Sequence, residues 1–112
     1  MNNITIDDLI TRIKTYNVDG IEKVLKVYHY AEKLHDGQIR QSGEAYISHP
    51  LNVCYILADM NADTDTLCAA LLHDTLEDSD ITKEEIEYEF NTDVANLVDG
   101  VTKLAKMNFS TK

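Results

Sequence analysis

The run Leu67-Cys68-Ala69-Ala70-Leu71-Leu72 is apolar at every position and lies within a segment of helical character. A helix that is apolar on all sides belongs in the centre of a hydrophobic core. The rest of the chain must therefore supply elements that surround this helix. With 112 residues, the chain has the length of one domain, and one proline with four glycines provides few of the turns that a β-rich fold needs.

Apolar residues recur at helical spacing through most of the remaining sequence, which predicts further helices around the central one. The expected starts are set by capping residues. They are Thr5, Asp19, Ser48 with Pro50 in the first turn, Asp63 or Thr64, and Thr82 with Glu85 in a capping box, and a last helix is expected to start at Thr92. The last of these helices should present Val94, Leu97, Val98, Val101 and Leu104 on one face, with the signal fading after Leu104. The predicted fold class is all-α, a compact bundle of helices.

The charge of the chain limits its partners. Ten Lys and Arg residues against twenty Asp and Glu residues give a net charge of −10 at pH 7. This charge argues against binding to nucleic-acid backbones and to anionic membrane surfaces. No apolar run is long enough for a transmembrane helix, and the N-terminus does not resemble a signal peptide. Cys54 and Cys68 lie in apolar helical contexts and form no CxxC motif, so we expect buried free thiols in a cytoplasmic protein.

The central apolar helix is followed at once by a cluster of ionisable residues. His73, Asp74, Glu77 and Asp78 would lie at about 0°, 100°, 40° and 140° around a helix that continued for one more turn. Carboxylates crowded at the end of a buried helix are costly unless a cation, hydrogen bonds or water relieves them. This spacing is compatible with a metal or catalytic site. It is also compatible with a helix that emerges into water with solvated acids.

A second histidine could complete a metal site. His49 is expected at the start of the third helix, and together with His73 and Asp74 it would offer two imidazole nitrogens and one carboxylate oxygen. This donor set suits Mn²⁺, Fe²⁺ or Zn²⁺. A single histidine at a helix start is also common as an ordinary surface or core residue, and His29 and His35 are weaker candidates.

The segment 37–46 is the least helical part of the sequence and holds two of the four glycines. It is longer than most connections between helices, and such long connections often carry functional residues.

Three blocks of the sequence, 35–50, 72–82 and 98–104, resemble blocks of the hydrolase domain of RelA/SpoT-type enzymes, in the same order and at matching intervals. The resemblance extends over residues 21–106. It implies a helical HD-type phosphohydrolase domain. It also implies an activity of the bacterial stringent response, in which the 3′-pyrophosphate of (p)ppGpp is removed to give GDP or GTP and pyrophosphate.

The resemblance assigns a role to each matching residue. One Mn²⁺ ion is implied to be held by His49, His73 and Asp74, and the catalytic pair that orients and activates water is implied to be Glu77 and Asp78. The implied nucleotide contacts are Arg40, Ser42 and Tyr46. Apart from the resemblance, Lys103 is a further positive charge that could help to bind an anionic nucleotide. Gln41 departs from the basic residue that often follows the loop arginine, which puts the nucleotide preference in doubt.

The resemblance also predicts what lies outside this sequence. The fourth metal ligand of the family is expected beyond Lys112, and the synthetase and regulatory domains are absent. Residues 1–112 are therefore expected to be an N-terminal portion of the hydrolase domain, weakly active or inactive by itself, with exposed apolar surface that favours self-association. Two alternatives remain open. They are a catalytically silent HD module that regulates a partner, and an HD phosphohydrolase for another nucleotide.

Overall fold

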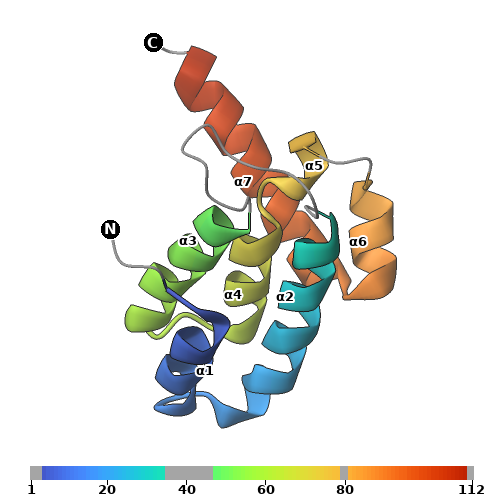
Figure 1. Cartoon of the computed structure of the whole chain (residues 1–112). Helices are drawn as coiled ribbons and strands as arrows, with labels where there is room; N and C mark the ends of the chain where they lie inside the picture. The colour runs from blue at the N-terminus through green and yellow to red at the C-terminus, as the bar shows by residue number, and fades with distance from the viewer. Residues whose placement is uncertain (1–3, 35–46, 79–80, 111–112) are drawn as a thin grey trace.

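The computed structural model describes residues 4–34, 47–78 and 81–110, with only the backbone for residues 77–78 and 102–110. Its described part is helical and contains no strand, which confirms the all-α prediction (Figure 1). The elements are α1 (Ile6–Lys14), the short 3-10 helix η1 (Val18–Gly20), α2 (Ile21–Leu34), α3 (Ser48–Asp59), α4 (Thr64–Leu72), α5 (Thr75–Asp78), α6 (Lys83–Glu89) and α7 (Thr92–Ser110). None of the described helices is both long enough and apolar enough to cross a membrane.

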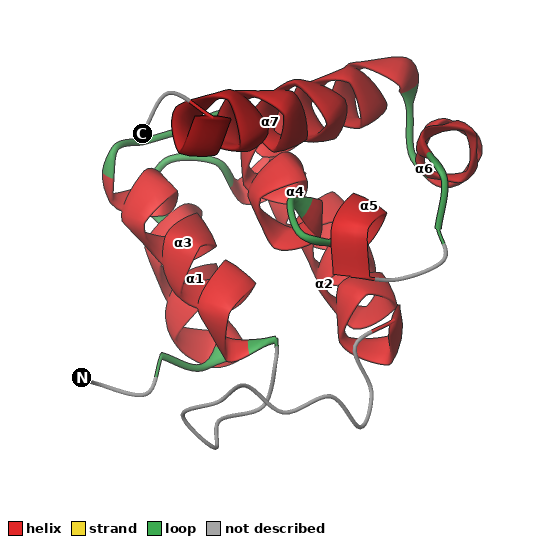
Figure 2. Ribbon diagram, turned by 90° about the horizontal axis from the view of Figure 1, so that it is seen from above, coloured by secondary structure: helices red, strands yellow, loops and turns green. Residues whose placement is uncertain are grey.

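Helix α4 is the centre of the fold, as its sequence predicts. Every residue from Leu67 to Leu72 is buried. The helix packs against α2, α3 and α7, which enclose it on three sides (Figure 2). Helix α1 covers α3, and α6 covers the start of α7. The wholly apolar helix thus governs the positions of α2, α3 and α7, because each of these helices removes part of its surface from water.

Three of the predicted helix starts are confirmed by their capping hydrogen bonds. Thr5 and Thr82 each form a capping box, in which the hydroxyl accepts from the third helical backbone N–H and that residue's carboxylate accepts from the cap N–H. The Asp63 carboxylate accepts from the N–H of Thr66 at 2.9 Å. Hydrogen bonding to Thr66 holds the pKa of Asp63 below its ordinary value. A side-chain cap of this kind contributes about 1 kcal/mol to helix stability.

Two predicted starts are wrong in detail. Asp19 does not cap α2, because residues 18–20 already form the 3-10 turn that runs into it. Ser48 is not an N-cap but the first helical residue of α3, since Ile47 before it has helical backbone angles and makes no side-chain cap. Pro50 lies in the first turn as expected and is buried.

The far end of α3 is held by a C-terminal motif and by one arginine. Asn61 adopts a left-handed conformation with φ 59°, while the N–H groups of Asn61 and Ala62 donate to the carbonyls of Ala58 and Leu57. This is the Schellman arrangement, which satisfies the last carbonyls of a helix. From α1, the guanidinium of Arg12 donates to the carboxylate and the carbonyl of Asp59 at 2.9 and 3.1 Å. The orientation of α3 is therefore fixed at the end opposite His49.

The last helix differs from its predicted packing face. Val94 and Val98 are buried, but Leu97 and Val101 are 41% and 45% exposed. The helical backbone also continues past Leu104, where the apolar signal fades, to Ser110. The reason for the difference is that α4 covers only one side of α7, so part of the predicted face has no partner among the described residues.

Both cysteines are buried free thiols, as predicted. They lie on neighbouring helices, and the Sγ of Cys54 on α3 is 3.5 Å from the carbonyl oxygen of Leu67 on α4. Burial raises the pKa of Cys54 and of Cys68 to about 12, so the thiolate form is rare at neutral pH.

A pair of glycine substitutions tests the packing of η1 against α4. A Cβ at Gly20 would meet the Thr64 hydroxyl and lie 2.6 Å from the Asn17 amide nitrogen, between two side chains joined by a hydrogen bond of 2.8 Å. We expect Gly20→Ala to lower the free energy of unfolding by about 1–3 kcal/mol in a urea titration. The control is Gly100→Ala on α7, where, apart from the chain neighbours and the helix's own backbone, no atom lies within 4 Å of the new Cβ. That variant should be more stable than wild type by about 0.5–1 kcal/mol. If Gly20→Ala lowered the free energy of unfolding by less than a substitution at an exposed helical position does, that result would contradict this packing.

Candidate metal centre

The site begins where α4 ends. Helix α4 stops at Leu72, residues 73–74 form a turn, and a new helical turn, α5, begins at Thr75. The continuous helix that would place all four ionisable residues on one side is therefore not formed. The hydroxyl of Thr75 donates to the carbonyl of Leu72 at 2.6 Å, which closes the turn. His73 and Asp74 leave the helix at this point, directly beside the core.

The structure brings together the three residues that the sequence suggests as metal ligands. The Nε2 atom of His73 lies 3.3 Å from Oδ2 of Asp74, and Nε2 of His49 lies 4.0 Å from the same oxygen. The two imidazole rings have centroids 5.3 Å apart and planes inclined at 61°. One potential ligand atom from each residue lies within 4.8 Å of the other two. His49 comes from the first turn of α3, whereas His73 and Asp74 come from the turn between α4 and α5.

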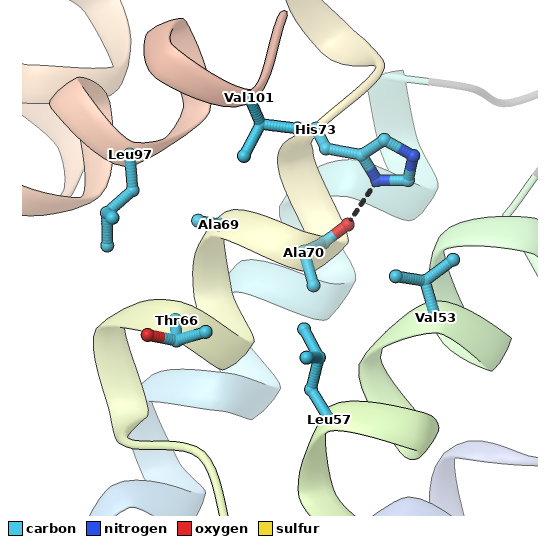
Figure 3. Close-up of a pocket in the computed structure, with 8 residues that line it drawn as sticks. All are labelled: Val53, Leu57, Thr66, Ala69, Ala70, His73, Leu97 and Val101. Carbon is cyan, nitrogen blue, oxygen red and sulfur yellow. Dashed lines mark hydrogen bonds between the residues drawn. The ribbon is translucent and has the colours of Figure 1, made fainter. Parts of the chain in front are cut away.

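One hydrogen bond fixes the chemical form of His73. Its Nδ1 lies 2.6 Å from the carbonyl oxygen of Ala70 in the last turn of α4 (Figure 3). Since a carbonyl can only accept, Nδ1 must carry the proton, and in the neutral ring Nε2 then carries the lone pair. Nε2 is the atom that faces Asp74. A backbone carbonyl bound to the second ring nitrogen is a common partner of metal-binding histidines.

The donor set fits a divalent cation. Two imidazole nitrogens and a carboxylate oxygen at these separations can approach one ion at about 2.0–2.2 Å after small side-chain rotations. His73, Asp74 and His49 have side-chain exposures of 17%, 28% and 39%. The centre is thus bounded by the core on one side and open on the other, which leaves coordination positions for water or a substrate oxygen.

The other predicted site residues are only partly visible. Glu77 and Asp78 belong to α5, which follows the turn, but their side chains are outside the described part of the structure. Arg40, Ser42 and Tyr46 also lie outside the described residues, as does His35. His29 is not part of the centre. Its ring is exposed on α2 and lies 3.5 Å from Glu32.

An apolar groove that the sequence did not predict leads to the centre. It has a volume of about 230 Å³ and lies on α4 between α3 and α7, with His73 at one end (Figure 3). Its walls are Val53 and Leu57 from α3 and Leu97 and Val101 from α7, above a floor of Thr66, Ala69 and Ala70. The exposed side chains of Leu97 and Val101 belong to this groove. In the sequence, the helical spacing of Val53 with Leu57 and of Leu97 with Val101 indicates that each pair lies on one face of its helix. Only the structure shows that the two pairs face each other.

The comparison with known families agrees with this fold and site. The model of the HD domain matches residues 28–112, so the chain belongs to the HD-domain family. It is 39% identical over its whole length to a guanosine-3′,5′-bis(diphosphate) 3′-pyrophosphohydrolase of Aquifex aeolicus, covering 16% of that protein. It is 53% identical over 80% of its length to the protein of the same name from Vibrio cholerae, covering 13% of it. It is also 48% identical over 89% of its length to the bifunctional (p)ppGpp synthase/hydrolase SpoT of Escherichia coli, covering 14% of it. The chain therefore spans about a seventh of the length of these curated relatives.

Metal titrations of single variants test the centre directly. We expect the wild-type chain to bind Mn²⁺ or Co²⁺ with one-to-one stoichiometry in isothermal titration calorimetry. Replacing a residue that hydrogen-bonds to a metal ligand usually lowers metal affinity 10–100-fold. Replacing a ligand itself should lower the affinity by more than this. His73→Ala and Asp74→Asn should therefore each weaken binding by at least about a hundredfold.

The matched control is His29→Ala, which removes an exposed histidine from α2 outside the centre. This variant should bind the metal like wild type. Equal loss of binding in His29→Ala and His73→Ala would show that the ion binds elsewhere, and the assignment of the centre would be wrong. Circular dichroism of each variant checks that the helices are retained.

Proposed function

We propose that this chain is the metal-binding part of a hydrolase domain that removes the 3′-pyrophosphate of (p)ppGpp, giving GDP or GTP and pyrophosphate. The observation that carries the proposal is the convergence of His49, His73 and Asp74 at the end of the central helix. The names of the relatives supply the substrate, since the chain matches proteins named as hydrolases of this nucleotide over most of its length.

The residues of the centre have distinct roles in this proposal. A divalent ion, Mn²⁺ by the family resemblance, would polarise a phosphoryl oxygen and lower the pKa of water. His49, His73 and Asp74 would hold that ion, and the Ala70 carbonyl keeps Nε2 of His73 available for it. Glu77 and Asp78 follow one turn later on α5, where a carboxylate could orient the attacking water and accept its proton.

The nucleotide would be recognised from the connection between α2 and α3. Arg40, Ser42 and Tyr46 are proposed as its contacts, because they match family positions in a segment that leads directly to His49. An arginine there would provide charge-assisted hydrogen bonds to phosphate or base. A local cation and one guanidinium would allow a chain with a net charge of −10 to bind a highly anionic small molecule. The free buried thiols support our further proposal that the protein works in the cytoplasm.

Two other functions remain as alternatives. A silent HD module would regulate a partner without turnover, and an HD phosphohydrolase of different specificity would act on another nucleotide. The preserved His-Asp and Glu-Asp pairs at 73–74 and 77–78 favour an active hydrolase over the silent module. The resemblance of residues 40–43 to the family loop favours a guanosine substrate.

A chimera tests the activity, because the fourth metal ligand of the family is expected in sequence that follows the matched stretch. The residues of the Escherichia coli relative that align with this chain would be replaced by those of this chain, and Mn²⁺-dependent (p)ppGpp breakdown measured by chromatography. We expect the chimera to be active and the 112-residue chain alone to show weak or no turnover. In the chimera, His73→Ala should reduce turnover by at least about a hundredfold, because loss of the ion removes several kcal/mol of stabilisation.

Glu77→Gln in the same chimera separates binding from chemistry. Removing a general base usually costs about 10²- to 10⁴-fold in rate, while Mn²⁺ binding should remain unchanged. A folded chimera that binds Mn²⁺ but does not hydrolyse (p)ppGpp would favour the silent module. Hydrolysis of other nucleotides alone would favour the altered specificity.

We also propose that the isolated chain self-associates weakly through the apolar groove between α3 and α7. Ile56 on α3 and Met60 directly after α3, with exposures of 60% and 72%, extend the apolar surface of α3. The net charge of −10 opposes association, so screening by salt should strengthen it. In sedimentation equilibrium we expect the dimer fraction to rise with NaCl and to fall in Leu97→Glu. Val18→Glu, an exposed apolar position on η1, is the control, and equal effects of the two variants would contradict a role for the groove.

A further inference from the structure

Thr75 is the one polar residue fully buried among the residues that the structure describes. It lies immediately after the candidate ligands His73 and Asp74, at the start of α5. Burying a hydroxyl without a partner is costly, so a buried threonine is retained only where its hydrogen bond contributes to the structure. The position of Thr75 next to the metal centre raises the question of what this hydrogen bond does for the ligands.

The Thr75 hydroxyl holds the end of α4. The last carbonyls of a helix have no intrahelical donor and need one from elsewhere. The hydroxyl of Thr75 supplies such a donor to the Leu72 carbonyl at 2.6 Å. Two residues earlier, the Ala70 carbonyl accepts from both the backbone N–H and the Nδ1–H of His73, at 3.4 and 2.6 Å. Both carbonyls are thus bound by groups of the turn instead of by a further helical turn.

His73 and Asp74 form the turn between α4 and α5, in which His73 itself keeps helical backbone angles, φ −61° and ψ −26°. Continuing α4 regularly would place successive side chains about 100° apart around one axis, whereas the observed turn brings Nε2 of His73 within 3.3 Å of Oδ2 of Asp74. Two local hydrogen bonds are made at this turn, from the Thr75 hydroxyl to the Leu72 carbonyl and from the His73 ring to the Ala70 carbonyl. A threonine hydroxyl that bonds to a carbonyl three residues back is known to bend or interrupt helices.

We propose that Thr75 is a positioning residue of the metal centre. Through its hydrogen bond to Leu72, it ends α4 at the residue before His73 and so keeps the Nε2 lone pair of His73 directed to the ion. Its methyl group contributes to packing, but its hydroxyl determines metal affinity. This inference rests on the proposed metal-dependent function, since it assigns a role in building that same centre.

Two substitutions separate the hydroxyl from the packing. Thr75→Val keeps the volume and loses the hydrogen bond, whereas Thr75→Ser keeps the hydrogen bond and loses one methyl group. We expect Thr75→Val to weaken Mn²⁺ binding by about 10–100-fold, the range seen for outer partners of metal ligands. Thr75→Ser should bind within about threefold of wild type, although the lost methyl group leaves it less stable in a urea titration. Ile13→Val in α1, buried and remote from the turn, controls for lost stability alone.

A second measurement distinguishes failure of this inference from failure of the proposed function. The ring ¹⁵N shifts of His73, recorded by NMR without metal at a pH where the imidazole is neutral, report which nitrogen carries the proton. Wild type and Thr75→Ser should show the Nδ1–H form, and Thr75→Val a mixture of both forms. Wild type that binds no Mn²⁺ would contradict the metal function, while the ring shifts would still test Thr75. Thr75→Val with wild-type affinity and wild-type shifts would overturn the inference.

Discussion

Burial of the apolar helix α4 is the constraint on which the rest of this structure depends. Because every residue from Leu67 to Leu72 has to leave water, α2, α3 and α7 must pack around this one helix. The cap at Asp63 and the Schellman motif after α3 then fix where α4 begins and where α3 ends. The position of the candidate centre follows directly, since it lies where α4 reaches the surface and its sequence changes from apolar to ionisable.

The end of a buried helix is a favourable place for a metal centre. The core holds the backbone rigidly up to Leu72, so the residues that follow are presented from a fixed support. The carbonyls left at the end of the helix provide acceptors, and one of them sets the proton on His73. The same end of α4 is close to the first turn of α3, which allows a second histidine to approach from a separate helix.

Much of this arrangement could be predicted from the sequence, but not its local geometry. Capping residues such as Thr5 and Thr82 predict helix starts because their hydrogen bonds are local. The ligand set of His49, His73 and Asp74 was suggested by residue type and by resemblance. The turn at His73 could not be predicted, because apolar residues continue through Leu76 and their spacing gives no information about the hydrogen bond that Thr75 makes. The groove depends on how α3 and α7 face each other across α4, which no single segment of sequence encodes.

The division of the centre between α3 and the end of α4 has a thermodynamic consequence. An ion held by His49 together with His73 and Asp74 would bind only when the two helices are packed, because unfolding separates the ligands. Binding would then favour the folded chain by RT ln(1 + [M]/Kd), a linkage that increases with metal concentration. Conversely, any change that moves α3 relative to α4 would change the affinity for the ion. This includes a change at the end of α3 that Arg12 holds. The interface between these two helices would therefore influence metal affinity in addition to forming part of the core.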